Sequence, residues 1–167
     1  KLIIVAGHGA AAVGVVALDY DETAEIVLQS EQLGTGHAVS QTKSALAGCT
    51  GDVIILYGDT PFVRPETLQS LSAARKTADI VVLGFNAGDP GRYGRLVMQG
   101  DAVSRIVEYK DASEQERAIT FCNSGVICAK AEVLFSLLEV VGNDNASGEY
   151  YLTDIVQLAN DRNLSVA

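Results

Sequence analysis

Short apolar runs alternate with longer mixed stretches along this chain. Helical periodicity is clearest near the end, where Tyr151, Ile155 and Leu158 share one face at i, i+4 and i+7. The runs have the composition of buried strands, at 2–7, 25–29, 52–58, 79–85 and 121–129. Helical patterns follow at 36–47, 64–76, 131–141 and from Glu149 onward. This alternation predicts an α/β fold with a mostly parallel sheet and helices on both faces.

The middle of the chain departs from this alternation. RLVM (95–98) and AVSRIVEY (102–109) flank Gln99-Gly100-Asp101, a pattern that is typical of a β-hairpin. The polar residues 113–119 predict a short helix. We therefore expect a small antiparallel hairpin insertion in the sheet, within a single domain that shows no internal repeat and no linker.

The first eighteen residues allow two interpretations. Lys1 followed by apolar and small residues is typical of a signal peptide. Gly7-His8-Gly9 breaks the apolar run after five or six residues, however, which favours a buried strand followed by a loop and a helix. Because the sequence does not start with Met, we expect the chain to begin inside a larger protein.

Charge and cysteine content exclude several classes of protein. Twelve Lys and Arg against 21 Asp and Glu leave a net charge of −9, so a nucleic acid or an acidic membrane is not an expected partner. Cys49, Cys122 and Cys128 are odd in number and form no C-x-x-C, which argues against a disulfide framework and a zinc site. Free thiols fit a reducing compartment, so we expect a cytoplasmic location, with Cys122 and Cys128 in the core.

Candidate chemistry lies where the predicted strands end. The segment EQLGTGHA (31–38) places Gly34 and Gly36 around Thr35 at the start of a predicted helix. Glycines let a ligand approach the backbone, and the free N–H groups of a helix start suit an anion or a base edge. Thr35 could equally be a simple N-cap with glycines that shape the turn. The pattern alone favours neither interpretation.

Asp59 directly follows the most strongly apolar strand. A single carboxylate there suits a Mg²⁺ ion that is held mainly by water and phosphate oxygens. The alternative is an Asx-turn over Asp59-Thr60-Pro61, and on pattern alone the turn is the better interpretation.

Other polar residues carry weaker signals. Arg92 and Arg95 of GRYGR (91–95) could hold phosphate or could simply face solvent, and Glu108 is the charged end of a strand. His8 and His37 have no obvious partner.

Taken together, six segments resemble one known family. Their order and spacing are similar to those of the pyrophosphorylase domain of bacterial N-acetylglucosamine-1-phosphate uridyltransferases, over the whole chain. The segments are Gln29 with EQLGTGHA (31–38), LYGDTP (56–61), GRYGR (91–95), IVEYKDA (106–112), NSGV (123–126) and GEYYLTDI (148–155). The resemblance implies a Rossmann-like nucleotidyltransferase fold. It also implies transfer of uridylyl from UTP to N-acetylglucosamine 1-phosphate, which gives UDP-N-acetylglucosamine and pyrophosphate.

The resemblance assigns a role to each matched position. Gln29 and Gly34 would read the uracil edge, and Thr35 would lie near the nucleotide. The nucleotide and metal region would be lined by Tyr57, Gly58 and Asp59, with Asp59 as the Mg²⁺ ligand at the catalytic centre. The amino sugar would contact Gly94, Glu108 and Asn123.

The chain also departs from the family pattern. The glycine-rich loop that wraps the triphosphate, an Asn that supplies a second metal ligand and the β-helix acetyltransferase domain have no counterpart in residues 1–167. We therefore expect the central part of one nucleotidyltransferase domain, without the family's trimer. Alone it should be inactive or nearly so. The alternatives are a non-catalytic sugar-nucleotide-binding module and a nucleotidyltransferase for another sugar 1-phosphate or base.

Overall fold

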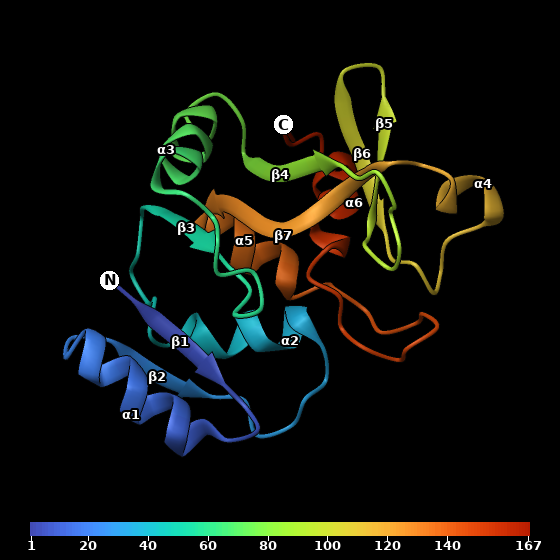
Figure 1. Cartoon of the computed structure of the whole chain (residues 1–167). Helices are drawn as coiled ribbons and strands as arrows, with labels where there is room; N and C mark the ends of the chain where they lie inside the picture. Colours follow the sequence, from blue (N-terminus) through green and yellow to red (C-terminus); the bar gives the residue numbers. More distant parts are fainter.

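The computed structural model describes all 167 residues and contains two separate β-sheets (Figure 1). The smaller sheet pairs β1 (Ile3–Ala6) in parallel with β2 (Glu25–Leu28). Helix α1 (Ala10–Tyr20) connects these strands, so the initial residues form the expected strand, loop and helix. No helix of the structure combines the length and the apolar character that crossing a lipid bilayer requires.

The larger sheet has five strands that are organised around the longest one, β7. The strands are β3 (Asp52–Ile55), β4 (Ile80–Asn86), β5 (Arg95–Gln99), β6 (Ala102–Val107) and β7 (Phe121–Lys130). Strands β3 and β4 flank β7 on its two sides, because Ile127, Cys128 and Ala129 have partners in both. The β5–β6 hairpin joins β7 at the pair Arg95 and Cys122.

The expected α/β class and the antiparallel hairpin insertion are confirmed. Strands β3 and β4 run in the same direction, as a mostly parallel arrangement requires, but β7 lies between them and runs against both. Every ladder of the larger sheet is therefore antiparallel. Direct parallel pairing occurs between β1 and β2 and at the single bridge from Ile80 to Val166.

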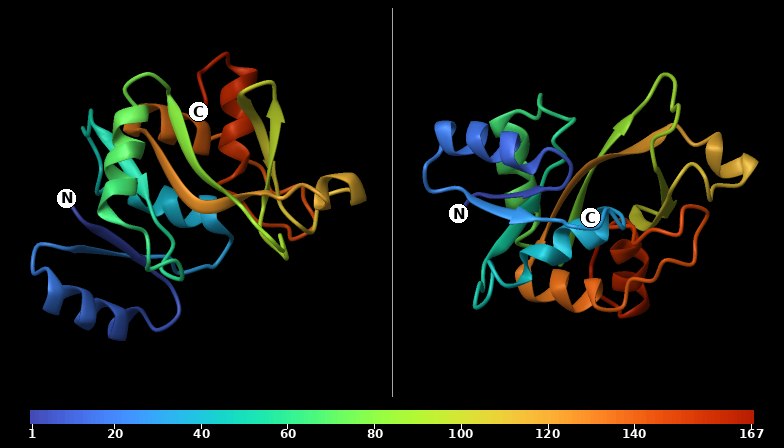
Figure 2. Two further views of the ribbon diagram at one scale, coloured as in Figure 1. Left: turned by 45° about the horizontal axis from the view of Figure 1, so that its top comes forward. Right: turned by 90° about the horizontal axis from the view of Figure 1, so that it is seen from below.

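Helices cover both faces of the larger sheet (Figure 2). Helix α3 (Pro65–Ala74) packs on one face, and α5 (Ala131–Leu138) and α6 (Asp154–Asp161) pack on the other. Strand β7 is buried on both sides, with Val126 and Cys128 in the core under α3 and Ile127 and Ala129 in the core under α5 and α6. This double burial explains the uninterrupted apolar run from residue 126 to residue 129.

The expected positions of the cysteines are confirmed. Cys122 and Cys128 are both fully buried, and all three thiols are free. The pKa of Cys128 is raised to about 11 by burial, so this thiol stays protonated and packs as a small apolar side chain.

The helix expected over 36–47 is shorter in the structure. Helix α2 (Thr35–Ser40) continues as a 3-10 turn, η1 (Gln41–Lys43), and then as irregular turns. The hydroxyl groups of Ser40 and Thr42 each donate to the carbonyl group three residues earlier, at 2.7 Å. Such bonds compete with regular helical pairing and tighten the chain.

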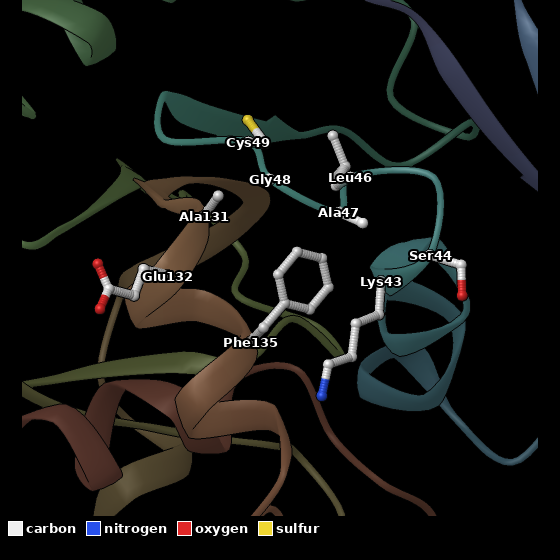
Figure 3. A pocket seen from close by; sticks show the side chains of 9 residues that line it. All are labelled: Lys43, Ser44, Leu46, Ala47, Gly48, Cys49, Ala131, Glu132 and Phe135. Carbon is white, nitrogen blue, oxygen red and sulfur yellow. The ribbon is translucent and has the colours of Figure 1, made fainter.

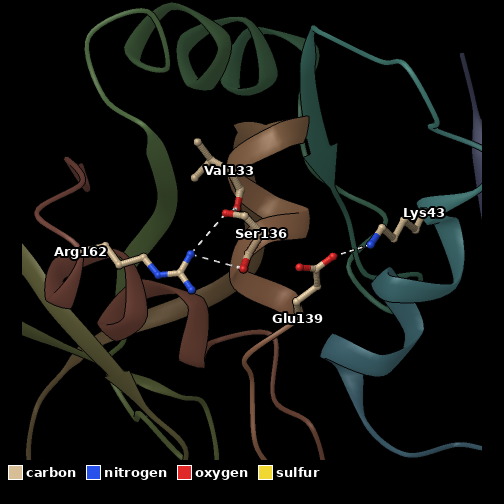
Figure 4. Close-up of polar contacts among 5 residues, drawn as sticks. All are labelled: Lys43, Val133, Ser136, Glu139 and Arg162. Carbon is tan, nitrogen blue, oxygen red and sulfur yellow. Dashed lines mark hydrogen bonds and ion pairs between the residues drawn. The ribbon is translucent and has the colours of Figure 1, made fainter.

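Polar contacts join the helices at the periphery. The short helix α4 (Glu114–Arg117) begins with a capping box between Ser113 and Glu116. Lys43 forms an ion pair of 2.5 Å with Glu139 beyond the end of α5, and Arg162 donates to the Ser136 carbonyl oxygen at 3.3 Å (Figure 4). These contacts attach η1 and the end of α6 to α5.

Candidate functional site

Gln29 lies at the end of β2 with its side chain almost fully buried, at 9% exposure. Its amide nitrogen donates to the Gly34 carbonyl oxygen at 3.1 Å and lies 3.1 Å from His37 Nδ1. On the other side of the ring, His37 Nε2 is 3.1 Å from the Gln41 amide nitrogen, so the expectation that His37 lacks a partner is wrong. Because the side-chain nitrogen of Gln29 is engaged, the side-chain oxygen Oε1 is the group left for a ligand.

The loop before α2 is bound to the segment before α6. The Gly36 N–H donates to the Tyr150 carbonyl oxygen at 2.8 Å, and the Leu152 N–H donates to the Thr35 hydroxyl oxygen at 2.9 Å. Gly34 has φ +113°, and a Cβ there would lie 2.6 Å from the Tyr150 oxygen. Only glycine fits at this position.

Thr35 is therefore not a simple N-cap. The N-cap position of α2 is Gly34, and no side chain caps the helix. The Thr35 hydroxyl instead holds Leu152, 117 residues further along the chain.

The turn after β3 exposes Asp59. The Tyr57 carbonyl oxygen accepts both the Thr60 N–H, at 3.1 Å, and the Thr60 hydroxyl, at 3.0 Å. The Asp59 carboxylate makes no hydrogen bond and is exposed, so the Asx-turn interpretation is wrong. Asp59 and its neighbour Gly58 are free to meet a ligand.

Tyr57 links this turn to β7. Its ring lies against Gly125, where φ is +83° and a Cβ would come within 2.6 Å of the ring. Burial raises the pKa of the Tyr57 phenol, the Thr35 hydroxyl lowers it in part, and the charges of Glu108 and Asp59 raise it further. The phenol therefore stays neutral and lies among the predicted site residues.

The residues that the resemblance assigns to the sugar also lie together. The Asn123 N–H donates to the Gly94 carbonyl oxygen at 2.9 Å. A Cβ on Gly94 would lie 3.4 Å from Glu108 Oε1, so the two positions are direct neighbours. Thr153 then donates its hydroxyl to the same Glu108 oxygen at 2.9 Å.

Together these contacts form a closed series that begins and ends at Thr35. They run from Thr35 to Tyr57 and Gly125, then through the β5–β6 hairpin to Glu108, and return through Thr153 and Leu152 to Thr35. We call this arrangement the contact ring. The structure thus brings together all nine positions, although they span residues 29 to 123. They are Gln29, Gly34, Thr35, Tyr57, Gly58, Asp59, Gly94, Glu108 and Asn123.

The segment Tyr150–Thr153 was missed as part of the site. It contacts both the loop before α2 and Glu108. The signal was present, because EYYLTDI is one of the segments that carry the resemblance, but only a helical role was assigned to it. The helix starts later than expected, at Asp154, since Tyr150 and Leu152 use their backbone groups in the contact ring.

Two carboxylates near Thr153 have raised pKa values. Burial raises the pKa of Glu108, although its hydrogen bond from Thr153 lowers it in part. Burial and then the charges of Glu108 and Asp111 raise the pKa of Asp154 to about 6. Ionising both groups therefore costs free energy at neutral pH.

This cost predicts a pH-dependent stability. Because the folded-state pKa of Asp154 lies above its unfolded value, its contribution to stability is complete below about pH 4 and is lost as the pH rises through 6. We expect Asp154→Asn to raise the free energy of unfolding by about 1–2 kcal/mol at pH 8, after allowance for partial exposure, and by little at pH 4.5. Urea unfolding at both pH values measures the difference. Asp161→Asn, at the exposed end of α6, is the matched control, and equal gains at both pH values would contradict the prediction.

Asp59 is the candidate metal ligand among the nine positions. No group of three His, Cys, Asp or Glu side chains could hold an ion. A lone exposed carboxylate without an internal partner fits a Mg²⁺ ion that takes its other ligands from water and phosphate oxygens. It does not fit an ion enclosed by protein ligands.

Two cavities accompany these features. The larger, of about 440 Å³, lies between the loop after η1 and α5, beside Lys43, Cys49 and Phe135, and contains none of the nine positions (Figure 3). The smaller, of about 330 Å³, includes Glu108 and is continuous with the contact ring. Its remaining lining residues are Arg92, Tyr109, Lys110, Ser147 and Tyr151.

The two arginines of GRYGR differ sharply. Arg92 is exposed beside the smaller cavity, whereas Arg95 is 1% exposed. Arg95 donates only to backbone carbonyl oxygens, among them those of Gly91 and Arg117. It neither holds phosphate nor faces solvent, so both earlier interpretations of Arg95 are wrong.

Comparison with known proteins gives close sequence relatives, although no protein-family profile matches the chain. It is 63% identical over 166 residues to the bifunctional protein GlmU of Ruegeria pomeroyi, and 59% identical over 167 residues to that of Roseobacter denitrificans. These matches cover 99% and 100% of the chain. The chain spans 37% of the length of each of these relatives.

Solved structures extend the likeness to the fold. A UDP-glucose pyrophosphorylase complexed with UDP-glucose superposes with a TM-score of 0.74 at 14% identity, over 96% of this chain and 69% of that one. A putative glucose-1-phosphate thymidylyltransferase from Bacillus anthracis gives 0.73 at 17% identity, over 100% and 67%. Over the 37% of their length that it spans, the chain is therefore a homologue of the bifunctional GlmU proteins, and it has the fold of sugar nucleotidyltransferases.

Proposed function

We propose that the protein containing this chain transfers uridylyl from UTP to N-acetylglucosamine 1-phosphate, with release of pyrophosphate. The observation that carries the proposal is the contact ring. It joins the position proposed for the uracil, at Gln29 and Gly34, to that proposed for the amino sugar, at Gly94, Glu108 and Asn123. A single extended ligand with a base at one end and a sugar at the other fits this arrangement.

The reaction makes few demands on side-chain chemistry. A sugar phosphate is largely dianionic at pH 7, because its second pKa is about 6, and it can attack the α-phosphorus without a general base. In-line attack then needs positioning and neutralisation of charge. The chain's residues hold the base at one end of the ring and the sugar at the other, which fixes the direction of attack.

Mg²⁺ is the proposed cofactor, and Asp59 is the residue that would hold it. When bound, the ion would offset negative charge on the phosphates. The exposed Asp59 carboxylate lies in the turn that follows β3, next to Gly58.

We also propose a cellular location and binding partners for the protein. The three free thiols fit a reducing compartment, and we place the protein in the cytoplasm. Its partners are the two substrates, and the trimer of the family is not expected from residues 1–167, which contain no β-helix.

Pyrophosphate release separates catalysis from simple binding. The full-length protein should release pyrophosphate from UTP only when N-acetylglucosamine 1-phosphate and Mg²⁺ are both present. Binding of UDP-N-acetylglucosamine without turnover would instead support a sugar-nucleotide-binding module. Faster turnover with another sugar phosphate or triphosphate would assign the enzyme to a different substrate.

Gln29→Ala is expected to weaken the preference for UTP over CTP. The free oxygen of Gln29 can accept the N3–H of uracil, whereas N3 of cytosine carries no hydrogen. Loss of one such bond costs about 1–3 kcal/mol, so the ratio of kcat/KM for UTP to that for CTP should fall about tenfold or more. Gln32→Ala is the control, since the Gln32 side chain donates only to the main-chain carbonyl oxygen of Gln29, at 2.9 Å. An unchanged ratio in the Gln29 variant would remove this residue from base recognition.

A further inference from the structure

Arg95 carries a buried positive charge that no carboxylate balances. It is 1% exposed and forms none of the ion pairs of the protein. Its Nη2 donates to the carbonyl oxygens of Gly91, at 3.0 Å, and Arg117, at 3.2 Å, and its Nη1 donates to that of Tyr93. Withdrawing a guanidinium from water costs free energy, and these hydrogen bonds compensate for part of that desolvation cost.

The partners of Arg95 surround one wall of the contact ring. Gly91 and Tyr93 belong to the turn that ends in Gly94, and Arg117 is the last residue of α4. The Tyr109 ring, next to Glu108, lies 5.9 Å from the Arg95 guanidinium carbon and 4.6 Å from that of Arg117. The planar guanidinium of Arg95 thus contacts the turn before Gly94, the end of α4 and the segment that follows Glu108.

The position of Gly94 depends on this turn. Its carbonyl oxygen must reach the Asn123 N–H, at 2.9 Å, and its α-carbon must leave room for the Glu108 carboxylate. Arg95 is the next residue in the chain and fixes the two carbonyl groups on the other side of Gly94. We propose that Arg95 is a positioning residue that sets the sugar end of the contact ring through the 91–94 turn.

This proposal rests on the proposed function and predicts a selective kinetic effect. Lysine keeps the charge but offers a point donor in place of the planar fork, so it cannot hold all three carbonyl groups at once. In the full-length protein, Arg95→Lys should raise KM for N-acetylglucosamine 1-phosphate about tenfold. KM for UTP should change less than about twofold, because Gln29 and Gly34 make no contact with this turn.

Arg162→Lys is the matched control. Arg162 also donates to a backbone carbonyl oxygen, that of Ser136 at 3.3 Å, but on the exposed side of α5 (Figure 4). Its substitution should leave both KM values unchanged. Amide hydrogen exchange at Asn123, measured without substrate, should accelerate in the Arg95 variant and not in the Arg162 variant, since the Gly94 acceptor is displaced.

The possible outcomes are distinct. Absence of turnover in the unsubstituted protein would overturn the proposed function, while the exchange at Asn123 would still test Arg95. Equal changes in both KM values, or unchanged exchange at Asn123, would overturn the positioning role. If Arg95→Lys does not fold, Arg95→Gln takes its place, because its planar amide can still donate to two carbonyl groups. Failure of both variants to fold would make Arg95 a residue of general stability and would also overturn the proposal.

Discussion

Asp59→Asn should reduce Mg²⁺-dependent pyrophosphate release by about 100-fold or more while leaving the fold intact. The Asp59 carboxylate is exposed and makes no hydrogen bond, and the turn around it is closed by Tyr57 and Thr60. Asparagine therefore preserves the local structure but removes the negative charge that a hard cation prefers. Loss of one electrostatic element at a phosphoryl-transfer centre typically costs two or three orders of magnitude in rate.

A true Asx-turn supplies the control. Asp21 accepts the N–H of Thr23 at 2.9 Å and its hydroxyl at 2.6 Å, at the exposed end of α1. Asp21→Asn should leave turnover unchanged. Both rates are measured over a Mg²⁺ titration, together with the thermal midpoint of unfolding. Normal Mg²⁺-dependent turnover in Asp59→Asn would refute the metal role.

Residues 1–167 by themselves should release pyrophosphate at least about 1,000-fold more slowly than the full-length protein. The nine predicted positions include two carboxylates and no cation, so they do not neutralise a triphosphate. Positioning and charge stabilisation provide most of the acceleration of such a reaction. These nine positions therefore contain groups for binding and a carboxylate for Mg²⁺, but no cationic side chain that would offset charge in the transition state.

The arrangement of the sheets gives a second reason. Strand β1 pairs only with β2, and β3 pairs only with β7, so each has an edge without a partner strand. Unpaired edges are prone to association and favour instability. Pyrophosphate release and the oligomeric state of residues 1–167 are compared with those of the full-length protein at equal concentration. Comparable rates would show that the rest of the protein is dispensable, which would refute the proposed mechanism.

Local patterns in the sequence predicted most of the elements, whereas the proposed site positions came from the family resemblance. The apolar stretch of β7 and the alternation of the β5–β6 hairpin are properties of neighbouring residues, and both were predicted. The place of β7 between β3 and β4 was not predicted, because it depends on pairing between strands that are far apart in the sequence. A run that is buried on both faces has the same composition whether its neighbours are parallel or antiparallel.

Long-range contacts also decided the roles of individual residues. Thr35 resembled a cap until Leu152 was placed on its hydroxyl, and Arg95 resembled a surface arginine until three carbonyl groups were found around it. For Asp59 the local pattern favoured a role in the turn, but the side chain that closes this turn is that of Thr60. In each case the role of the residue depends on a hydrogen bond that the local motif does not specify.

The structure of the full-length protein bound to UDP-N-acetylglucosamine is the most direct test of the proposed base and sugar positions. We expect the uracil N3 to lie within hydrogen-bond distance of the side-chain oxygen of Gln29, about 2.7–3.2 Å, and the amino sugar to lie beside Gly94, Glu108 and Asn123. A ligand seated instead in the cavity beside Phe135, or one with its sugar remote from Glu108, would contradict it.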